Sequence, residues 1–261
     1  MRWSSKAGIM GCALAFVSCG SFVRKSEVTA VKRVAILSLF GNNSIYHGGN
    51  AEFSDDWGSS RKESAAGIAF DSFKKELKKL GWKVMDAHRA VDSPEYQNIK
   101  APRRILASST RGTSSAFFAM KGMRPFVFDK VDSLPNAQET DTSDASEVLK
   151  HLGRMATLLG VDAVAIVEIR YCYQTAKGEE VAYVTADSAL KLVDRKGVLI
   201  VNMPAIKHCG SGSARAQQGA EMLGGKLMLT NLPRETFEKI FRQVSAATAE
   251  RTVIRIQKEI Q

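Results

Sequence analysis

The sequence predicts an α/β fold of the α+β kind, in which helices flank a mixed β-sheet, and three observations support it. Compact apolar runs at 31–40, 161–169 and 181–193 have the length and composition of buried strands. Two longer stretches with helical spacing of apolar residues, 60–80 and 233–260, alternate with these runs. An order of strand, helix, strand, helix, strand, hairpin and closing helix is typical of a mixed sheet packed by helices.

The first long helix is predicted from the residues at its two ends. Ser60 and Glu63 form a capping-box pattern, which predicts that the helix begins there. Gly81 tolerates the left-handed conformation with which helices commonly end. Residues 82–85 then predict a second strand, and the polar stretch 41–57 predicts a loop before the helix.

Residues 88–144 are predicted to form an irregular insertion in the domain. Prolines interrupt this stretch at Pro94, Pro102, Pro125 and Pro135. Within it we expect a helix over 95–107, a short strand at 126–128 and a polar loop over 136–146.

Regular structure is predicted again from Asp144, which forms a helix-capping pattern with Glu147. This helix is expected to end at Gly160. Strands are expected over 161–169, 181–193 and 198–203. The turn 194–197 joins the last two strands as a hairpin, with Gly197 where a positive φ is needed.

The remainder of the chain is predicted to be helical. After a Gly/Ser loop at 210–213, a helix is expected over 214–223. A long amphipathic helix over 233–260 closes the chain. Its apolar side comprises Phe237, Ile240, Phe241, Val244, Ala247, Val253 and Ile256.

The first twenty residues differ in character from the rest of the chain. Arg2 and Lys6 accompany an apolar run over 7–17, and small residues lead to Cys19. A basic start, an apolar stretch of about ten residues and a small exit match a secretory signal peptide. The run is too short to span a bilayer. The alternatives are a helix of the core and an ordinary cleaved signal with an incidental cysteine.

The exit of this segment, Phe16-Val17-Ser18-Cys19, resembles the bacterial lipobox. In a lipobox the cysteine is diacylated and becomes the new N-terminus. Phe16 and Val17 depart from the usual Leu-Ala. Aspartate directly after the cysteine is a retention signal in such lipoproteins, and its absence after Cys19 implies, through the same resemblance, an outer-membrane location.

The sequence is predicted to have three parts. Residues 1–18 are the signal peptide, 19–31 are a lipidated tether, and 32–261 form a single α/β domain. Acyl chains on Cys19 partition into a bilayer at about 0.8 kcal/mol per methylene, so two or three of them anchor a protein firmly.

The charge of the chain favours anionic partners. Removal of the signal peptide lowers the net charge from +10 to +8, because Arg2 and Lys6 leave with no acidic residue. The basic residues are scattered, and the densest group, 74–79, is predicted to be the solvated side of a helix. No nucleic-acid partner is therefore expected.

Two thiols remain besides Cys19 when the signal peptide is removed, and they belong to Cys172 and Cys209. In an oxidising compartment such a pair is able to form one disulfide. The alternative is that each is a small buried core residue.

Two segments resemble periplasmic lipoproteins with the fold of the TolB amino-terminal domain. They are Leu158-Leu159-Gly160-Val161-Asp162-Ala163-Val164-Ala165 and the strand–turn–strand segment 190–200. Relatives in that group include the curli-secretion lipoprotein and a lipoprotein activator of a peptidoglycan synthase. The resemblance implies a non-enzymatic envelope role with no cofactor, and it transfers no catalytic residue.

Several residues invite a chemical interpretation, and each also has a structural one. The glycines of 210–213 could cradle an anion or serve as a flexible connector. His208, Cys209 and Ser211 suggest a nucleophile, but neighbours on a strand point to opposite faces. The histidines have no partner at metal-ligand spacing, so no metal site is predicted.

The loop over 42–57 is the predicted partner-binding surface. It follows the carboxyl end of an inner strand, where open α/β sheets place their binding sites. Its candidate contact residues are Asn42, Tyr46, Phe53 and Trp57. The aromatic side chains could anchor a partner or fold back over the sheet.

The sequence therefore predicts a membrane-anchored periplasmic lipoprotein, held at the outer membrane by its N-terminal lipid, that acts as a binding or assembly accessory for another envelope component. An envelope protein is the expected partner, and no oligomeric state is predicted. The alternatives are a hydrolase that uses a crevice near Gly41 or Gly210, and a protein that binds a small anion or a glycan.

Overall fold

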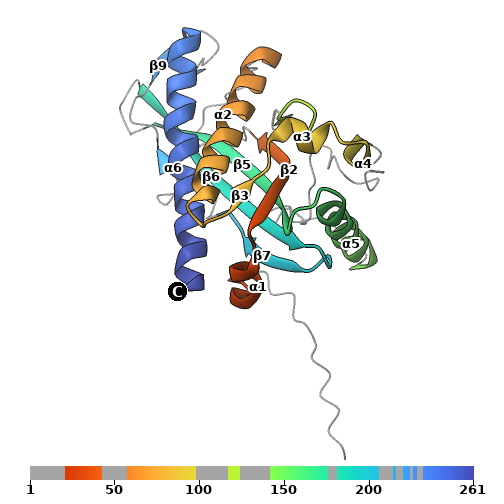
Figure 1. The fold of residues 1–261 in the computed structure, drawn as a ribbon. Helices are drawn as coiled ribbons and strands as arrows, with labels where there is room; N and C mark the ends of the chain where they lie inside the picture. Colours follow the sequence, from red (N-terminus) through yellow and green to blue (C-terminus); the bar gives the residue numbers. More distant parts are fainter. Residues whose placement is uncertain are drawn as a thin grey trace, which may run out of the picture.

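The computed structural model describes residues 21–42, 58–97, 117–123, 142–175, 181–205, 214–215, 220–223, 226–227 and 232–261. The described chain forms a mixed sheet of six main strands flanked by helices, with a long helix at the C-terminus (Figure 1). This arrangement confirms the α/β class that the sequence predicts.

The main sheet has the strand order β1-β7-β6-β5-β2-β3. Its strands are β1 (Phe22–Val23), β2 (Arg33–Asn42), β3 (Lys83–Val84), β5 (Ala163–Thr175), β6 (Val181–Asp194) and β7 (Leu199–Met203). Strand β2 pairs in parallel with β3 and β5, whereas β5–β6, β6–β7 and β7–β1 are antiparallel. The apolar runs of the sequence thus occupy the centre of the sheet.

Short strands extend the sheet at its margins. They are β4 (Phe117–Ala119), β8 (Ala214–Arg215), β9 (Ala220–Leu223) and β10 (Lys226–Leu227). Strand β4 pairs with β2, β8 and β9 pair with β6, and β10 pairs with β9. Strand β7 reaches only as far as Leu190 of β6, so β8 and β9 supply partners for the remaining length of β6.

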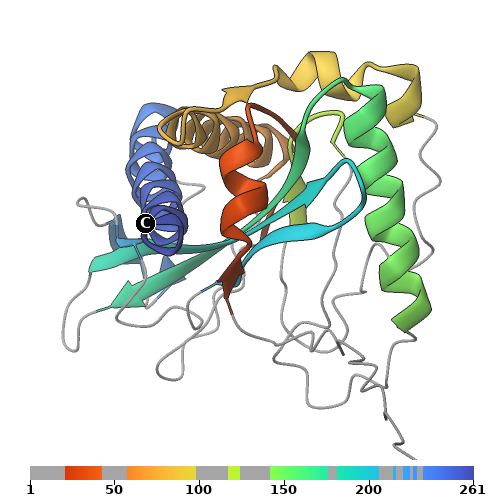
Figure 2. The same cartoon turned by 60° about the horizontal axis from the view of Figure 1, so that its bottom comes forward.

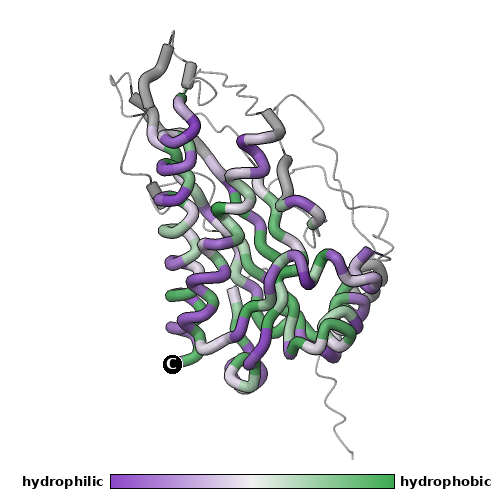
Figure 3. Tube along the Cα trace, turned by 45° about the horizontal axis from the view of Figure 1, so that its top comes forward, coloured by the Kyte–Doolittle hydropathy of each residue, from purple (hydrophilic) through white to green (hydrophobic). Residues whose placement is uncertain are grey.

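Two long helices cover one face of the sheet. They are α2 (Gly58–Lys78) and α6 (Arg234–Ile260), and they lie side by side with the short helix α1 (Lys25–Ala30) near the C-terminus (Figures 1 and 2). Helices α3 (Ala87–Val91), α4 (Pro94–Gln97) and α5 (Thr142–Leu158) lie away from this pair (Figure 2). The apolar residues concentrate in the strands between these helices (Figure 3).

Helix α6 packs on the sheet through hydroxyl groups as well as apolar side chains. The Tyr171 hydroxyl lies 2.8 Å from Ser245 Oγ, and Ser188 Oγ lies 2.7 Å from Thr252 Oγ1. All four side chains are buried. Burial of these hydroxyls is tolerated because they bond to one another across the interface. The face of α6 toward the sheet is therefore broader than its apolar residues alone predict.

Helix α5 approaches the β6–β7 turn so closely that both sides require glycine. A Cβ on Gly153 would lie 2.7 Å from the Cα of Gly197 and 2.9 Å from the carbonyl oxygen of Arg195. Gly197 has φ +76° and faces the backbone of Leu149 and Lys150. Backbone therefore meets backbone at this contact, which fixes α5 against the hairpin.

Several predictions from the sequence are confirmed. Gly81, Gly160 and Gly197 all adopt a positive φ. The turn after β6 is closed by the Asp194 side chain, which accepts the amide N–H groups of Lys196 and Val198. The predicted apolar residues of the last helix are buried, except Ala247, which is half-buried.

The prediction of a helix over 214–223 is wrong. Residues 214–215 and 220–223 are strands, because the free edge of β6 offers backbone groups that pair with them. Pairing of this kind overrides the helical preference of alanine, glutamate and leucine.

The tether predicted over 19–31 is also corrected, because its described residues belong to the fold. Phe22 and Val23 pair with β7, which would otherwise be an exposed edge. Val28 and Val31 are buried. The domain therefore begins at Phe22 and not at residue 32.

Smaller corrections concern helix ends and the insertion. Helices α2 and α5 begin at Gly58 and Thr142, two residues before the predicted caps Ser60 and Asp144. Of the helix predicted over 95–107, the described part is α4, and the rest lies outside the described residues. The strand predicted at 126–128 also lies outside them, whereas β4 was not predicted.

The contact between Gly153 and Gly197 generates a stability prediction. We expect Gly153→Ala to lower the free energy of unfolding by about 1–3 kcal/mol, because the new methyl group overlaps the turn. Gly67→Ala is the matched control, since Gly67 lies within α2 with nothing within 4 Å of its Cβ position. The control should raise the free energy of unfolding by about 0.5–1 kcal/mol. Urea denaturation measures both, and a Gly153→Ala variant as stable as the control would contradict the contact.

Candidate functional site

Asp162 organises the end of the sheet at which parallel strands β2, β3 and β5 begin. Its Oδ2 accepts the backbone N–H groups of Lys32 at 3.0 Å and Arg33 at 2.8 Å. Its Oδ1 lies 2.9 Å from Arg195 Nη2. Arg195 Nε also donates to the carbonyl oxygen of Val161 at 2.6 Å. One carboxylate therefore ties the start of β2 and the β6–β7 turn to the start of β5.

The electrostatics of Asp162 reflect these contacts. Partial burial by itself raises the pKa of the carboxyl group. The amides of Lys32 and Arg33, together with the guanidinium groups of Arg195 and Arg33, outweigh burial and hold the pKa of Asp162 below 3.8. The carboxylate is thus ionised at neutral pH and stabilises the fold in that form.

Exposed cations gather around this junction. We call this surface the basic end, and it comprises Arg24, Lys25, Lys32, Arg33, Lys83, Arg89, Arg195 and Lys196. Lys25 Nζ donates to the carbonyl oxygen of Gln261 at 2.8 Å, which places α1 beside the C-terminus. Glu27 of α1 has a lowered pKa because Ser26 and its own amide bond to it and because Arg24 and Lys196 lie near. The residues come from distant parts of the sequence and share one end of the domain.

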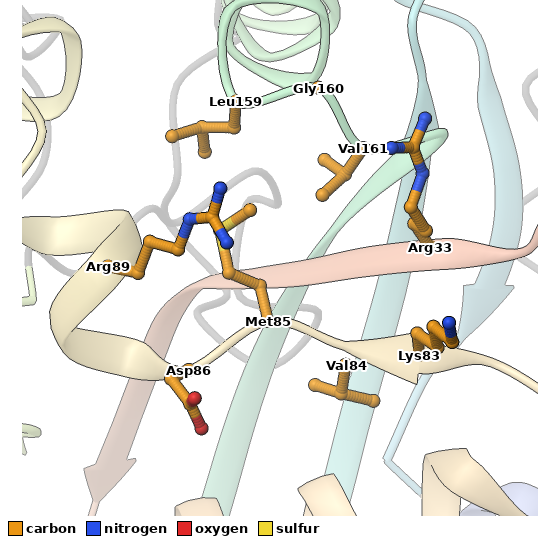
Figure 4. A pocket seen from close by; sticks show the side chains of 9 residues that line it. All are labelled: Arg33, Lys83, Val84, Met85, Asp86, Arg89, Leu159, Gly160 and Val161. Carbon is orange, nitrogen blue, oxygen red and sulfur yellow. The ribbon is translucent and has the colours of Figure 1, made fainter.

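A shallow pocket of about 280 Å³ opens at the basic end (Figure 4). It is lined by Arg33, Lys83, Val84, Met85, Asp86, Arg89, Leu159, Gly160 and Val161. Arg33 and Arg89 reach toward it from different elements, while Asp86 points away (Figure 4). Guanidinium and ammonium groups above an apolar floor are suited to bind a small anion that carries an organic group.

The acidic group of this pocket is already engaged. Asp86 forms an ion pair with Lys74 of α2, and that hydrogen bond lowers the pKa of the carboxyl group. Its negative charge is therefore offset by a cation outside the pocket. The lining groups Arg33, Lys83 and Arg89 leave the pocket with a positive field.

The described part of the predicted partner-binding loop is Asn42, at the other end of β2 from the basic pocket. Asn42 is the last residue of this strand and not a loop residue, and its backbone is in register with Phe117 and Arg170. Tyr46, Phe53 and Trp57 lie outside the described residues. The structure thus separates Asn42 from the basic pocket by the full length of β2.

The predicted cysteine sites are described only in part. Cys172 belongs to β5, and its backbone is in register with Thr185. The side chain of Cys172, all of Cys209, Cys19 and the glycines of 210–213 lie outside the described residues. Their predicted lipidation, disulfide and anion-binding roles remain predictions.

Sequence reasoning missed a row of charged residues beside Asn42. We call Glu168, Arg170 and Asp187 the polar row. Arg170 is in register with both Asn42 and Asp187, and its Nε lies 2.8 Å from Glu168 Oε1. Their neighbours Tyr171 and Ser188 contact α6, so alternation along the strands points the polar row to the opposite face. The signal in the sequence that could have revealed the polar row is the presence of charged residues within otherwise apolar strands.

Within the described residues, no group of three or more His, Cys, Asp or Glu side chains is arranged to hold a metal ion. In the same part of the chain, no helix combines the length and the apolar character that crossing a membrane requires.

Comparison with known proteins gives no relative to set beside this geometry. No family model matches the chain, and neither a curated protein nor a solved structure matches it at a significant level.

The Asp162 junction generates a prediction. We expect Asp162→Ala to lower the free energy of unfolding at neutral pH by about 2 kcal/mol, because two strand amides and Arg195 lose their acceptor. Asp71→Ala, which removes an exposed carboxylate from α2, is the control and should change stability by less than about 0.5 kcal/mol.

The difference in unfolding free energy between wild type and Asp162→Ala depends on pH, and the direction follows from the sign of the pKa shift of Asp162. The folded-state pKa of Asp162 lies below its ordinary value of 3.8, so its stabilising contribution is complete above that pH. The difference between wild type and Asp162→Ala should shrink only as the pH falls below 3.8. Denaturation series at several pH values measure this, and a difference that disappears near neutral pH would rule out the ionised carboxylate as its cause.

Proposed function

We propose that this protein is a lipoprotein anchored through Cys19 at the periplasmic face of the outer membrane, where it acts as a binding or assembly accessory for another envelope component. The basic and apolar character of 1–18 and the lipobox-like exit support export and acylation.

The observation that carries the proposal is the short distance along the chain from Cys19 to the fold. Strand β1 begins at Phe22, so Gly20 and Ser21 are the residues between them. A chain spans at most about 3.6 Å per residue, which places the Cα of Cys19 within about 11 Å of the Cα of Phe22. An acylated Cys19 would therefore hold the domain directly against the membrane surface.

A fold like that of the TolB amino-terminal domain is part of the proposal. The helix–Gly–Val–Asp–Ala–strand segment and the Asp194–Gly197 turn are the features of the sequence that support it. In the structure, Asp162 and Arg195 connect these two segments directly. Their contact gives both segments a common structural role.

The partner surface is proposed where β2 ends beside the middle of β5. The polar row lies there, in register with Asn42 and next along the chain to the loop over 43–57. Charged groups beside a loop that contains Tyr46, Phe53 and Trp57 resemble the mix of anchor and polar residues found in protein interfaces.

The basic pocket favours a second candidate function, the binding of a small anion or a glycan. Arg33, Lys83 and Arg89 surround the apolar side chains of Met85, Leu159 and Val161. This function is compatible with the first, because the pocket lies where β2 and β5 begin and the polar row lies where β2 ends.

The anchoring proposal is tested by Cys19→Ala in the native host. We expect the variant to leave the membrane fraction, because it has no thiol to acylate at that position. Cys12→Ala is the matched control, since it removes a thiol from the same segment and should leave the protein in membranes. Mass spectrometry of the native protein should find a lipid on residue 19, and recovery of an intact Met1 peptide without fatty acid would overturn the proposal.

The partner surface is tested by site-specific photocrosslinking in cells. A photoreactive residue in place of Tyr46 should give one discrete adduct with an envelope protein, and Trp57→Ala should reduce that adduct at least about fivefold, as loss of an aromatic anchor predicts. A photoreactive residue at Arg242, which is exposed on α6, is the control. Adducts that are equal at the two positions would place the partner elsewhere.

A further inference from the structure

The basic end carries more cations than its acids neutralise. The acids in the same region are Glu27, Asp86, Asp162 and Asp194, with Asp92 at the end of α3 and Glu259 near the end of α6. Asp86 is paired with Lys74, Asp162 with Arg33 and Arg195, and Asp194 with the amides of its own turn. Glu27 lies near Arg24 and Lys196, so Lys83 and Arg89 are left to give the pocket its positive field.

The same end of the domain lies close to the proposed anchor. Arg24 and Lys25 follow β1 directly, and the charges of Arg24 and Lys196 both act on Glu27. Figure 1 shows α1, the β6–β7 hairpin and the C-terminus at one end of the domain. The cations nearest to Cys19 along the chain are therefore continuous with those that surround the pocket.

We propose that the basic end docks on an anionic phospholipid surface and that the pocket between Arg33, Lys83 and Arg89 holds the phosphate of one headgroup. The proposal rests on the anchoring function and specifies which surface of the domain faces the membrane. Phosphate oxygens accept hydrogen bonds from guanidinium and ammonium groups, and those bonds are charge-assisted.

The surroundings of the pocket fit a lipid headgroup. Met85, Leu159 and Val161 form an apolar floor, and the neighbouring Leu158 is 53% exposed at the end of α5. Apolar side chains beside cations are the combination that lies in a membrane interface. The cations also extend from α1 to α3, a wider surface than a single free phosphate ion would contact.

Stable peripheral attachment to a membrane requires two binding features. The acyl chains of Cys19 and the basic end would provide them together. One acyl anchor combined with a basic surface binds anionic bilayers more tightly than either does alone. The basic end would then orient the domain, so that the polar row, which lies where β2 ends, is held away from the bilayer.

The test uses the mature chain, residues 19–261 with Cys19→Ala, which contains every element of the described fold. Cosedimentation is measured with vesicles of phosphatidylglycerol mixed with phosphatidylcholine and with vesicles of phosphatidylcholine alone. We expect binding to the anionic vesicles that weakens when salt is raised from about 0.05 to about 0.5 M.

Two double variants with equal loss of charge locate the surface. Lys83→Ala with Arg89→Ala should weaken vesicle binding about 25-fold, at about fivefold per cation. Arg234→Ala with Arg242→Ala removes two exposed cations from the amino-terminal half of α6, far from the C-terminus, and should weaken binding less than about twofold. Equal losses in the two variants would show that net charge alone drives binding and would overturn the proposal.

In a further experiment, inorganic phosphate is added to the protein in the absence of vesicles. The backbone amide signals of residues 83–89 and 159–161 are followed by NMR. Phosphate binding there without vesicle binding would identify a free-anion site and overturn the lipid proposal. Equal binding to the anionic vesicles and to vesicles of phosphatidylcholine alone would overturn the lipid proposal as well. All these measurements use a chain without acylation, so their failure is distinct from failure of the Cys19→Ala fractionation experiment.

Discussion

The structure depends on the burial of β5 between β2 and β6. Strand β5 pairs in parallel with β2 and along its 13 residues with β6. A parallel pair requires crossover connections, and these put helices on the faces of the sheet. Helix α2 connects β2 to β3, and α5 leads into β5 through Gly160. The placement of α2 and α5 follows from the parallel pairing of β2 with β3 and β5.

The same strand separates two kinds of polar group. Asp162 precedes β5 and gathers Arg33 and Arg195 around it, whereas Glu168 and Arg170 lie further along the strand. Between these positions the side chains of β5 are buried and apolar. The proposed membrane-facing surface therefore lies at the start of β5 and the proposed partner-facing surface near its middle, so a ligand at one does not compete with a ligand at the other.

The packing of α6 shows how the sheet is closed without a purely apolar interface. Phe237 and Phe241 stack with ring centroids 4.3 Å apart, and Phe241 meets Tyr171 at 4.9 Å. Toward the C-terminus the contacts change to hydroxyl groups, where Ser188 meets Thr248 and Thr252. Because these buried hydroxyl groups satisfy one another's hydrogen bonds, the helix packs against the sheet along its length.

The sequence by itself determined the central strands, both long helices and the glycines with positive φ. Each of these is fixed by local chemistry, namely apolar runs, helical spacing and the absence of a Cβ. The tertiary structure decided the strands within 214–223 and the folding of 22–31 onto β7, because free sheet edges recruit segments that local preference assigns elsewhere. It also decided the basic end, since Arg24, Lys83, Arg89 and Arg195 are distant in the sequence and meet only when parallel strands begin at one edge of a sheet.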